Sequence, residues 1–210
     1  KPGGTPMQID DLPKPAIIHL SDDQSRWNNI QSQIFGWPLK PPMIFPAYSN
    51  LPTPGWWKAG GGAWGCRLSH LELMAKAIQS NTTAFVMEDD FLLCDGFAEK
   101  LEQFLAVVPQ DWQGLWIGGL HIEKPRYVNA DVVRNTNTQC NQCYLLRGQY
   151  LRDCWVELQR FDQHIDWLTG SKMSSPSYPV YSPVRWLVGQ SAGYSHIRRK
   201  TLAERWFNPL

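Results

Sequence analysis

The stretch TAFVMEDDF at residues 83–91 runs from a short apolar segment directly into three carboxylates, Glu88, Asp89 and Asp90. An apolar run of this length without alternation is typical of a strand that is buried on both faces of a sheet. Adjacent carboxylates at its end repel one another and lose hydration, so they need a positive partner. Carboxylate oxygens suit magnesium, manganese or calcium, and open α/β sheets bind ligands at the carboxyl ends of their strands. The stretch therefore predicts a metal and phosphate site, with a plain polar turn as the alternative.

The segments on either side of this stretch alternate between strand and helix patterns. Apolar runs at residues 16–20 and 115–120 predict two further buried strands. Helical spacing of apolar residues predicts helices over residues 24–35, 66–79 and 97–108. This order is typical of a single α/β domain with a mostly parallel central sheet flanked by helices.

Local signals predict where some of these helices begin. Asp23 and its neighbours are typical of a turn and helix cap before residue 24. The glycine-dense segment 60–65 predicts a tight or mobile turn, which lacks the Gly-Lys-Ser/Thr of a phosphate-binding loop. Ser69 and Glu72 have the spacing of a capping box, which gives Ser69 a structural role at a helix start.

The composition narrows the range of partners. The chain has 210 residues, a formal net charge of +1 and 43% hydrophobic residues, so it can bury a core and shows no charge bias toward nucleic acid or membrane. Its five cysteines are an odd number, which argues against a complete disulfide framework. Cys140 and Cys143 have CxxC spacing, but no second pair completes a zinc site. The lack of a signal peptide and the odd cysteine count favour a cytoplasmic location.

Several of these motifs also occur together in a familiar order. The segment GCRLSH at residues 65–70 precedes a helix, EDD at residues 88–90 ends a strand, and later come PQDW at 109–112 and GG at 118–119. Over residues 16–197 the chain resembles glycosyltransferase family 25, which includes lipopolysaccharide-type and collagen-type sugar transferases. The resemblance implies a single GT-A-like α/β domain. Residues 1–15 would then be an irregular arm and residues 198–210 a basic C-terminal tail.

The resemblance also implies a set of site residues. Asp90 would be the direct ligand of a divalent metal, manganese or else magnesium, and Glu88 and Asp89 would position ribose, metal-bound water or the sugar. The resemblance implies that the donor is bound by Leu20, Arg26, Ala47, Tyr48, Ser69, His70, Glu88, Asp89 and Gln190. His196 would contact the metal or the diphosphate. The implied donor is a UDP-sugar that carries galactose or glucose.

Sugar transfer with inversion needs a general base for the acceptor hydroxyl. Asp166 matches the downstream aspartate of the family, with Asp162 and His164 as close rivals, and Asp89 is a second catalytic candidate. The acceptor would be a glycan, a lipid-linked sugar or a protein. The segment 36–58, rich in Pro and Trp, departs from the family pattern and is expected to shape the acceptor site.

Two other functions compete with this hypothesis. The chain could be a degenerate family member that binds a sugar nucleotide or glycan without turnover, although the intact EDD argues against this. It could also be a transferase that modifies nucleic acid or a protein that binds it, as Trp56, Trp57 and the basic residues 198–200 suggest. The near-zero net charge weakens that hypothesis.

Overall fold

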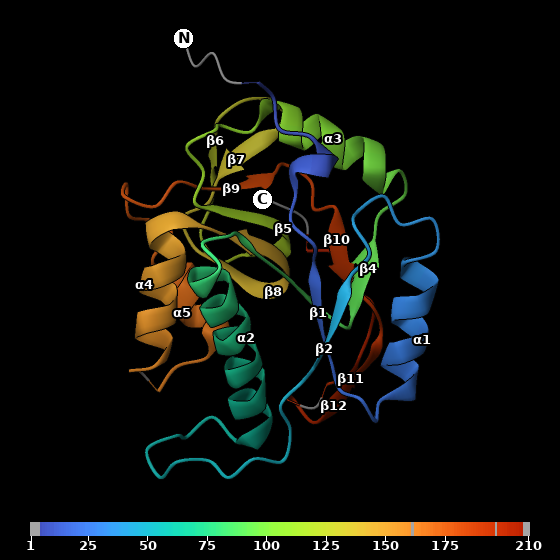
Figure 1. The fold of residues 1–210 in the computed structure, drawn as a ribbon, viewed down its shortest axis with the longest axis vertical. Coiled ribbons are helices and arrows are strands. Elements are labelled where there is room, and N and C mark those ends of the chain that lie inside the picture. Colours follow the sequence, from blue (N-terminus) through green and yellow to red (C-terminus); the bar gives the residue numbers. More distant parts are fainter. Residues whose placement is uncertain (1–4, 161, 196, 208–210) are drawn as a thin grey trace.

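The fold is an α/β domain built on one large sheet. The computed structural model describes residues 5–160, 162–195 and 197–207. The strands of the large sheet are β1 (Ala16–His19), β2 (Met43–Pro46), β3 (Ala84–Glu88), β5 (Gly114–His121), β6 (Arg126–Tyr127), β7 (Val132–Arg134), β8 (Thr138–Leu146) and β9 (Val180–Pro183). They are arranged in the order β2-β1-β3-β8-β5-β9-β7-β6 (Figure 1). Two small sheets pair β4 (Phe91–Leu93) with β10 (Val188–Gln190), and β11 (Gly193–Ser195) with β12 (Lys200–Leu202).

The predicted α/β class is confirmed, and within the sheet parallel and antiparallel pairings are mixed. β1 pairs in parallel with β2 and β3, and β5 pairs in parallel with β9. β8 lies antiparallel between β3 and β5, because the chain turns back through the β6–β7 hairpin before it enters the middle of the sheet. The strand that ends in the carboxylates is thus central, with a parallel neighbour on one side and an antiparallel one on the other.

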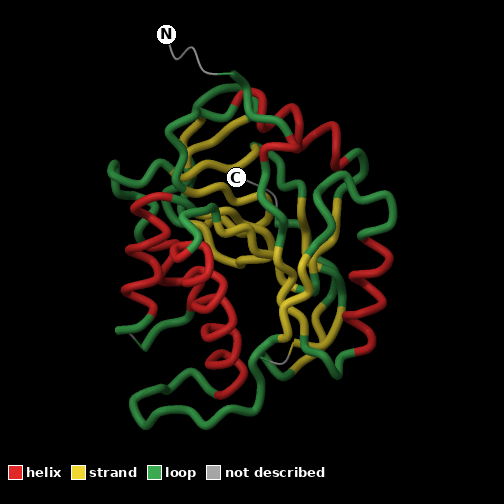
Figure 2. The backbone as a smooth tube through the Cα atoms, viewed as in Figure 1, coloured by secondary structure: helices red, strands yellow, loops and turns green. Residues whose placement is uncertain are grey.

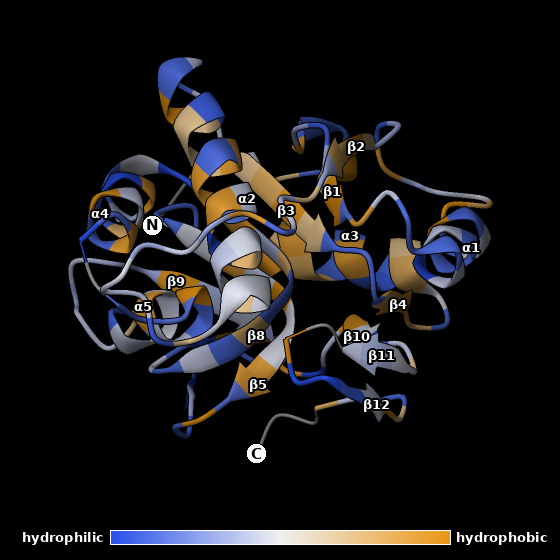
Figure 3. Ribbon diagram, turned by 90° about the horizontal axis from the view of Figure 1, so that it is seen from below, coloured by the Kyte–Doolittle hydropathy of each residue, from blue (hydrophilic) through white to orange (hydrophobic). Residues whose placement is uncertain are grey.

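Helices cover both faces of the sheet (Figure 2). They are the 3-10 helix η1 (Ile9–Asp11), α1 (Gln24–Gln33), α2 (Gly61–Gln79), α3 (Phe97–Val107), α4 (Gly148–Leu158) and α5 (Ile165–Ser171). Successive strand residues point to opposite faces, so Ile17 and Met87 enter the core beside α1 and α3, whereas Ile18 and Val86 enter the core beside α2 and α4. Both faces of β3 are therefore apolar, and Figure 3 shows this strand coloured as hydrophobic in the middle of the fold.

Helix α2 begins earlier than the sequence predicts. Gly60, with φ 87°, precedes a helix that starts at Gly61, so the predicted glycine turn is wrong. At Gly65 a Cβ atom would lie 2.0 Å from the backbone oxygen of Tyr48, so glycine is required for this close approach. The capping box is also wrong, because Ser69 lies inside the helix, where its hydroxyl donates to the Gly65 carbonyl and accepts from the Tyr48 amide.

Other local predictions are confirmed. The Asp23 side chain caps α1 by accepting from the Arg26 amide at 3.0 Å. β3 ends at Glu88, and Asp89 and Asp90 form a turn that leads into β4. The arm at residues 5–15 is mostly irregular, yet Ile9 and Leu12 are buried in the core under α3. Among the described residues, no helix combines the length and apolar character needed to cross a membrane.

Candidate active site

A cavity of about 840 Å³ opens at the carboxyl ends of β1 and β3. Its walls come from α2, the irregular middle of β8, the start of α5, and the segment from β10 to β12. The predicted site residues that line it are Leu20, Arg26, Ala47, Tyr48, His70, Glu88, Asp89, Asp90, Asp166 and Gln190. Ser69 is fully buried and reaches the cavity only through the Tyr48 backbone, and His196 lies outside the described residues.

Arg26 is the positive partner of two of the three carboxylates. Its Nη1 lies 2.8 Å from Asp90 Oδ2 and 3.3 Å from Asp89 Oδ1. Asp89 also accepts from the Leu20 amide at 3.3 Å, and its Oδ2 is 3.0 Å from His19 Nδ1. Both carboxylate oxygens of Asp89 thus have protein partners, so its side chain fixes the end of the strand. These contacts weaken Asp89 as a candidate catalytic group.

Asp90 is held on one side only. Its Oδ2 accepts from Gln190 Nε2 at 2.7 Å in addition to Arg26. Its Oδ1 is buried and finds no hydrogen-bond partner within the described residues. An unpaired buried carboxylate oxygen is costly in a protein interior. This oxygen suits a hard divalent cation, so the residues present fit the metal that the sequence motif implies.

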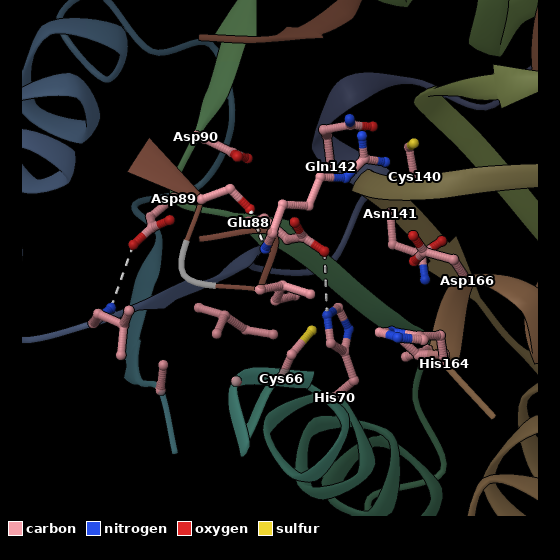
Figure 4. A pocket seen from close by; sticks show the side chains of 18 of the residues that line it. Cys66, His70, Glu88, Asp89, Asp90, Cys140, Asn141, Gln142, His164 and Asp166 are labelled. Carbon is pink, nitrogen blue, oxygen red and sulfur yellow. Dashed lines mark hydrogen bonds and ion pairs between the residues drawn. The ribbon is translucent and has the colours of Figure 1, made fainter. Parts of the chain in front are cut away.

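Glu88 is the carboxylate that faces the open cavity. Its side chain is 28% exposed, and its Oε1 lies 3.5 Å from Nε2 of the fully buried His70 (Figure 4). Tyr144 orients the histidine, since its hydroxyl is 2.7 Å from His70 Nδ1. Cys66, one turn earlier on α2, completes a group of three potential ligands.

Asp166 stands on the opposite wall, at the start of α5 (Figure 4). Burial, together with the nearby charge of Glu88, raises the pKa of its carboxyl group from 3.8 to about 7. A backbone hydrogen bond from Cys140 and the charge of Arg198 oppose this rise in pKa. A carboxyl group that titrates near neutral pH can accept a proton from an acceptor hydroxyl.

The rival bases are placed differently. His164 lines the cavity, and burial lowers its pKa below the ordinary value of 6.5. Asp162 is not part of the lining and instead accepts from the Lys58 amide at 3.2 Å. Geometry therefore favours Asp166 over Asp162.

A bulge in β8 supplies side chains that sequence reasoning did not place here. The register between β5 and β8 shifts so that residues 140–142 lie opposite Gly119, and Cys140 adopts φ 63°. Asn141 and Gln142 are turned into the cavity wall, and Trp116 Nε1 donates to Asn141 Oδ1 at 3.1 Å. The CxxC spacing of Cys140 and Cys143 marks the same segment, and none of the five cysteines, all described, forms a disulfide.

The basic residues after 197 were predicted as a tail, and their described part folds back onto the domain. Arg198, Arg199 and Arg205 line the cavity, and the backbones of Arg205 and Gln190 pair at 2.9 Å. Together with Arg26 they set positive charge against the carboxylate cluster. Such a wall attracts a phosphate-bearing ligand.

Trp167 and Trp57, two of the tryptophans of the chain, differ in their relation to the cavity. Trp167, next to Asp166, lines the cavity and is 48% exposed. Trp57 is buried against Trp64, and the Arg67 guanidinium lies 5.0 Å from its ring centre. Trp57 is therefore a structural residue, whereas Trp167 exposes indole surface within the cavity.

Comparisons with known proteins support the family resemblance over the segment that holds the motifs at residues 65–70, 88–90, 109–112 and 118–119. The sequence model described as glycosyltransferase family 25 (LPS biosynthesis protein) matches residues 58–154. A search of curated proteins finds no match. Among solved structures, a glycosyltransferase involved in the glycosylation of the major capsid of PBCV-1 is similar, with a TM-score of 0.36 and 11% identity over 70% of this chain and 68% of that chain.

Proposed function

We propose that this chain, a glycosyltransferase of the family 25 type, moves a hexose, galactose or glucose, from a UDP-sugar to an acceptor hydroxyl with inversion. The observation that carries the proposal is the cavity that brings Arg26, Asp90 and Asp166 to one space from three distant parts of the chain. The arginines that would bind the diphosphate and the candidate base Asp166 then line the same cavity, in which the hexose would lie.

The donor diphosphate would lie against the arginine wall. Arg26 is anchored by the carboxylates and by the Tyr194 carbonyl at 3.0 Å, so its position is fixed before the ligand arrives. Arg198, Arg199 and Arg205 add positive charge from the β10 to β12 side. Preorganised cations of this kind stabilise the negative charge that develops on a leaving diphosphate.

A divalent metal would add to this stabilisation. Asp90 is the residue expected to hold it, through the Oδ1 that has no hydrogen-bond partner among the described residues. When bound, the ion would act as a Lewis acid toward the diphosphate oxygens. Manganese and magnesium both suit a carboxylate oxygen, so the residues present do not choose between them.

Asp166 would act as the base. As the acceptor oxygen forms its bond to the anomeric carbon, the bond from that carbon to the diphosphate oxygen breaks and UDP leaves with the electron pair. The hydroxyl proton passes to the Asp166 carboxylate, whose pKa of about 7 suits proton transfer near neutral pH. One displacement of this kind inverts the configuration at the anomeric carbon.

The acceptor would enter beside α5. Trp167 is adjacent to Asp166 in the chain and offers an exposed indole in the same cavity. Indole rings stack on the apolar faces of sugars while their N–H stays hydrated. A glycan or a lipid-linked sugar fits this wall, and a sugar-bearing protein would use the same contact.

Binding of UDP tests the donor half of the proposal. UDP with manganese at about 100 times its dissociation constant should stabilise the fold by about 2.7 kcal/mol, or about 5–10 °C for a chain of this size. Asp90→Asn should remove the manganese-dependent part of this shift, whereas Asp95→Asn, at an exposed turn outside the cavity, should retain it. An equal shift in wild type and Asp90→Asn would refute the metal assignment.

Release of UDP from a panel of UDP-hexoses tests turnover itself. We expect release with UDP-galactose or UDP-glucose that increases when a glycan acceptor is added. Tight UDP binding without release from any donor would instead show a degenerate protein that only binds the nucleotide.

A further inference from the structure

Three side chains of different chemistry converge on one wall of the cavity. Cys66 and His70 are four residues apart on α2, so they project from the same face of the helix, and Glu88 reaches them from the end of β3. Their ligand atoms, one sulfur, one nitrogen and one oxygen, all lie within 4.8 Å of one another. Figure 4 shows the three side chains pointing toward a common point.

His70 is oriented in the manner of a metal ligand. It is fully buried, and its Nδ1 lies 2.7 Å from the Tyr144 hydroxyl. Its Nε2 has no hydrogen-bond partner in the part of the chain that the structure describes, although buried ring nitrogens usually have one. When Nδ1–H donates to the Tyr144 oxygen, the Nε2 lone pair points at Cys66 and Glu88. A hydrogen bond that fixes the tautomer and leaves the other nitrogen free is typical of histidines that bind metals.

We propose that Cys66, His70 and Glu88 hold a divalent transition metal ion of borderline softness, zinc or an ion of similar chemistry. Thiolate, imidazole and carboxylate together suit such an ion and do not suit magnesium or calcium. The 3.5 Å between His70 Nε2 and Glu88 Oε1 is close to the ~3.4 Å edge of a tetrahedral zinc site, and the Cys66 sulfur lies within 4.8 Å of both atoms.

The charges of this set balance. On binding, the Cys66 thiol releases its proton to solvent, Glu88 is ionised and His70 binds as the neutral imidazole. The ion's two positive charges then cancel the thiolate and the carboxylate, so the closed site is neutral. Because Cys66, His70 and Glu88 all line the cavity, an ion held by them would have space to accept water or a substrate oxygen as a fourth ligand.

This site goes beyond the proposed function. Asp90 is not one of the three ligands, and its unpaired oxygen suits a hard ion bound together with the diphosphate. The Cys66 site would be filled by the protein alone, without a sugar nucleotide. The competing arrangement is a metal-free ion pair of protonated His70 with Glu88.

Cobalt(II) is the probe, because its bond to a thiolate gives a charge-transfer absorption in the near ultraviolet. Chelator-treated protein comprising residues 1–210 should bind about one equivalent and develop this band without any donor. Cys66→Ser should abolish the band, whereas Cys140→Ser, at the other cysteine of the cavity wall, should retain it. Tyr144→Phe should weaken cobalt binding by about 10–100-fold, as loss of an orienting partner does.

The wild-type spectrum alone can overturn the proposal, so it does not depend on the variants folding. Stoichiometric cobalt without a thiolate band, or binding of manganese only, would refute it. A band that survives in folded Cys66→Ser, checked by circular dichroism, would also refute it. Failure of UDP release with an intact cobalt band would remove the proposed transfer function and leave the metal site standing.

Discussion

Replacing Asp166 by asparagine tests the base assignment and the energetics of the cavity together. The substitution keeps the shape and an oxygen for the Cys140 backbone hydrogen bond, but it removes the ionisable group. In the wild-type protein, burial and Glu88 raise the pKa of this carboxyl group from 3.8 to about 7. The folded state therefore prefers the protonated acid, and ionisation at higher pH opposes folding.

The size of this effect follows from the pKa shift. A rise from 3.8 to about 7 corresponds to about 4 kcal/mol, and since Asp166 keeps access to the cavity, solvent screening leaves about 2 kcal/mol. Below about pH 4 the group is protonated in both states and has no effect. The destabilisation grows between about pH 4 and pH 7 and is constant above that range. Asp166→Asn should thus unfold about 4–8 °C higher than wild type at pH 8, and the difference should shrink toward pH 4.

The same substitution should lower the transfer activity, although it raises stability at pH 8. Wild-type kcat/KM should rise with pH through about 7, as the carboxylate forms. In Asp166→Asn, kcat should fall by about 100–10,000-fold while UDP binding is retained. Asp162→Asn is the matched control, because Asp162 does not line the cavity. A variant that keeps the wild-type rate, or a pH profile unchanged by the substitution, would show that Asp166 is not the base.

Three further substitutions have defined outcomes. Gly65→Ala should lose about 3 kcal/mol of stability in denaturant unfolding, because the new Cβ meets the Tyr48 oxygen at 2.0 Å, whereas Gly61→Ala points into open space and should be neutral. Arg26→Met should destabilise the apoprotein by about 3–5 kcal/mol and make added manganese more stabilising than in wild type, measured by thermal unfolding. Trp167→Ala should raise the KM for a glycan acceptor about 5–10-fold with a smaller change in kcat. An unchanged acceptor KM would exclude the stacking role.

The strand that ends in the carboxylates was predictable because its signal is local. A short unbroken apolar run that ends in acids is typical of a buried strand, and residues 84–88 do form the buried strand β3. The start of α2 was not predictable from local propensity. Glycines 61, 62 and 65 disfavour a helix in isolation, but packing of Gly65 against the Tyr48 backbone requires a residue without a side chain.

The far wall of the cavity depends on long-range pairing. Residues 140–142 reach the site through a bulge whose position is set by the register of β8 against β5, and no local pattern encodes that register. Arg198 and Arg205 arrive through a fold-back of the chain that their charge alone did not indicate. Asp166 was predicted from family resemblance, and its raised pKa arises from neighbours distant in sequence.

Three consecutive acids in a sequence are compatible with either a metal site or a polar turn. The surroundings of Glu88, Asp89 and Asp90 show why their charge alone could not distinguish the two. The strand ends at Glu88 and the next two acids lie in a turn, so each acid has a different set of partners, although Arg26 contacts both Asp89 and Asp90. Asp89 is saturated by Arg26, His19 and a backbone amide, and it serves as the polar turn. Asp90 shares Arg26 but keeps one buried oxygen unpaired, which leaves a place for a cation. Glu88 turns toward Cys66 and His70, a set that a softer ion would complete. The polar turn and the proposed metal sites therefore involve different residues of one motif, and measuring which ions bind with and without UDP would separate the contributions of Asp90 and Glu88.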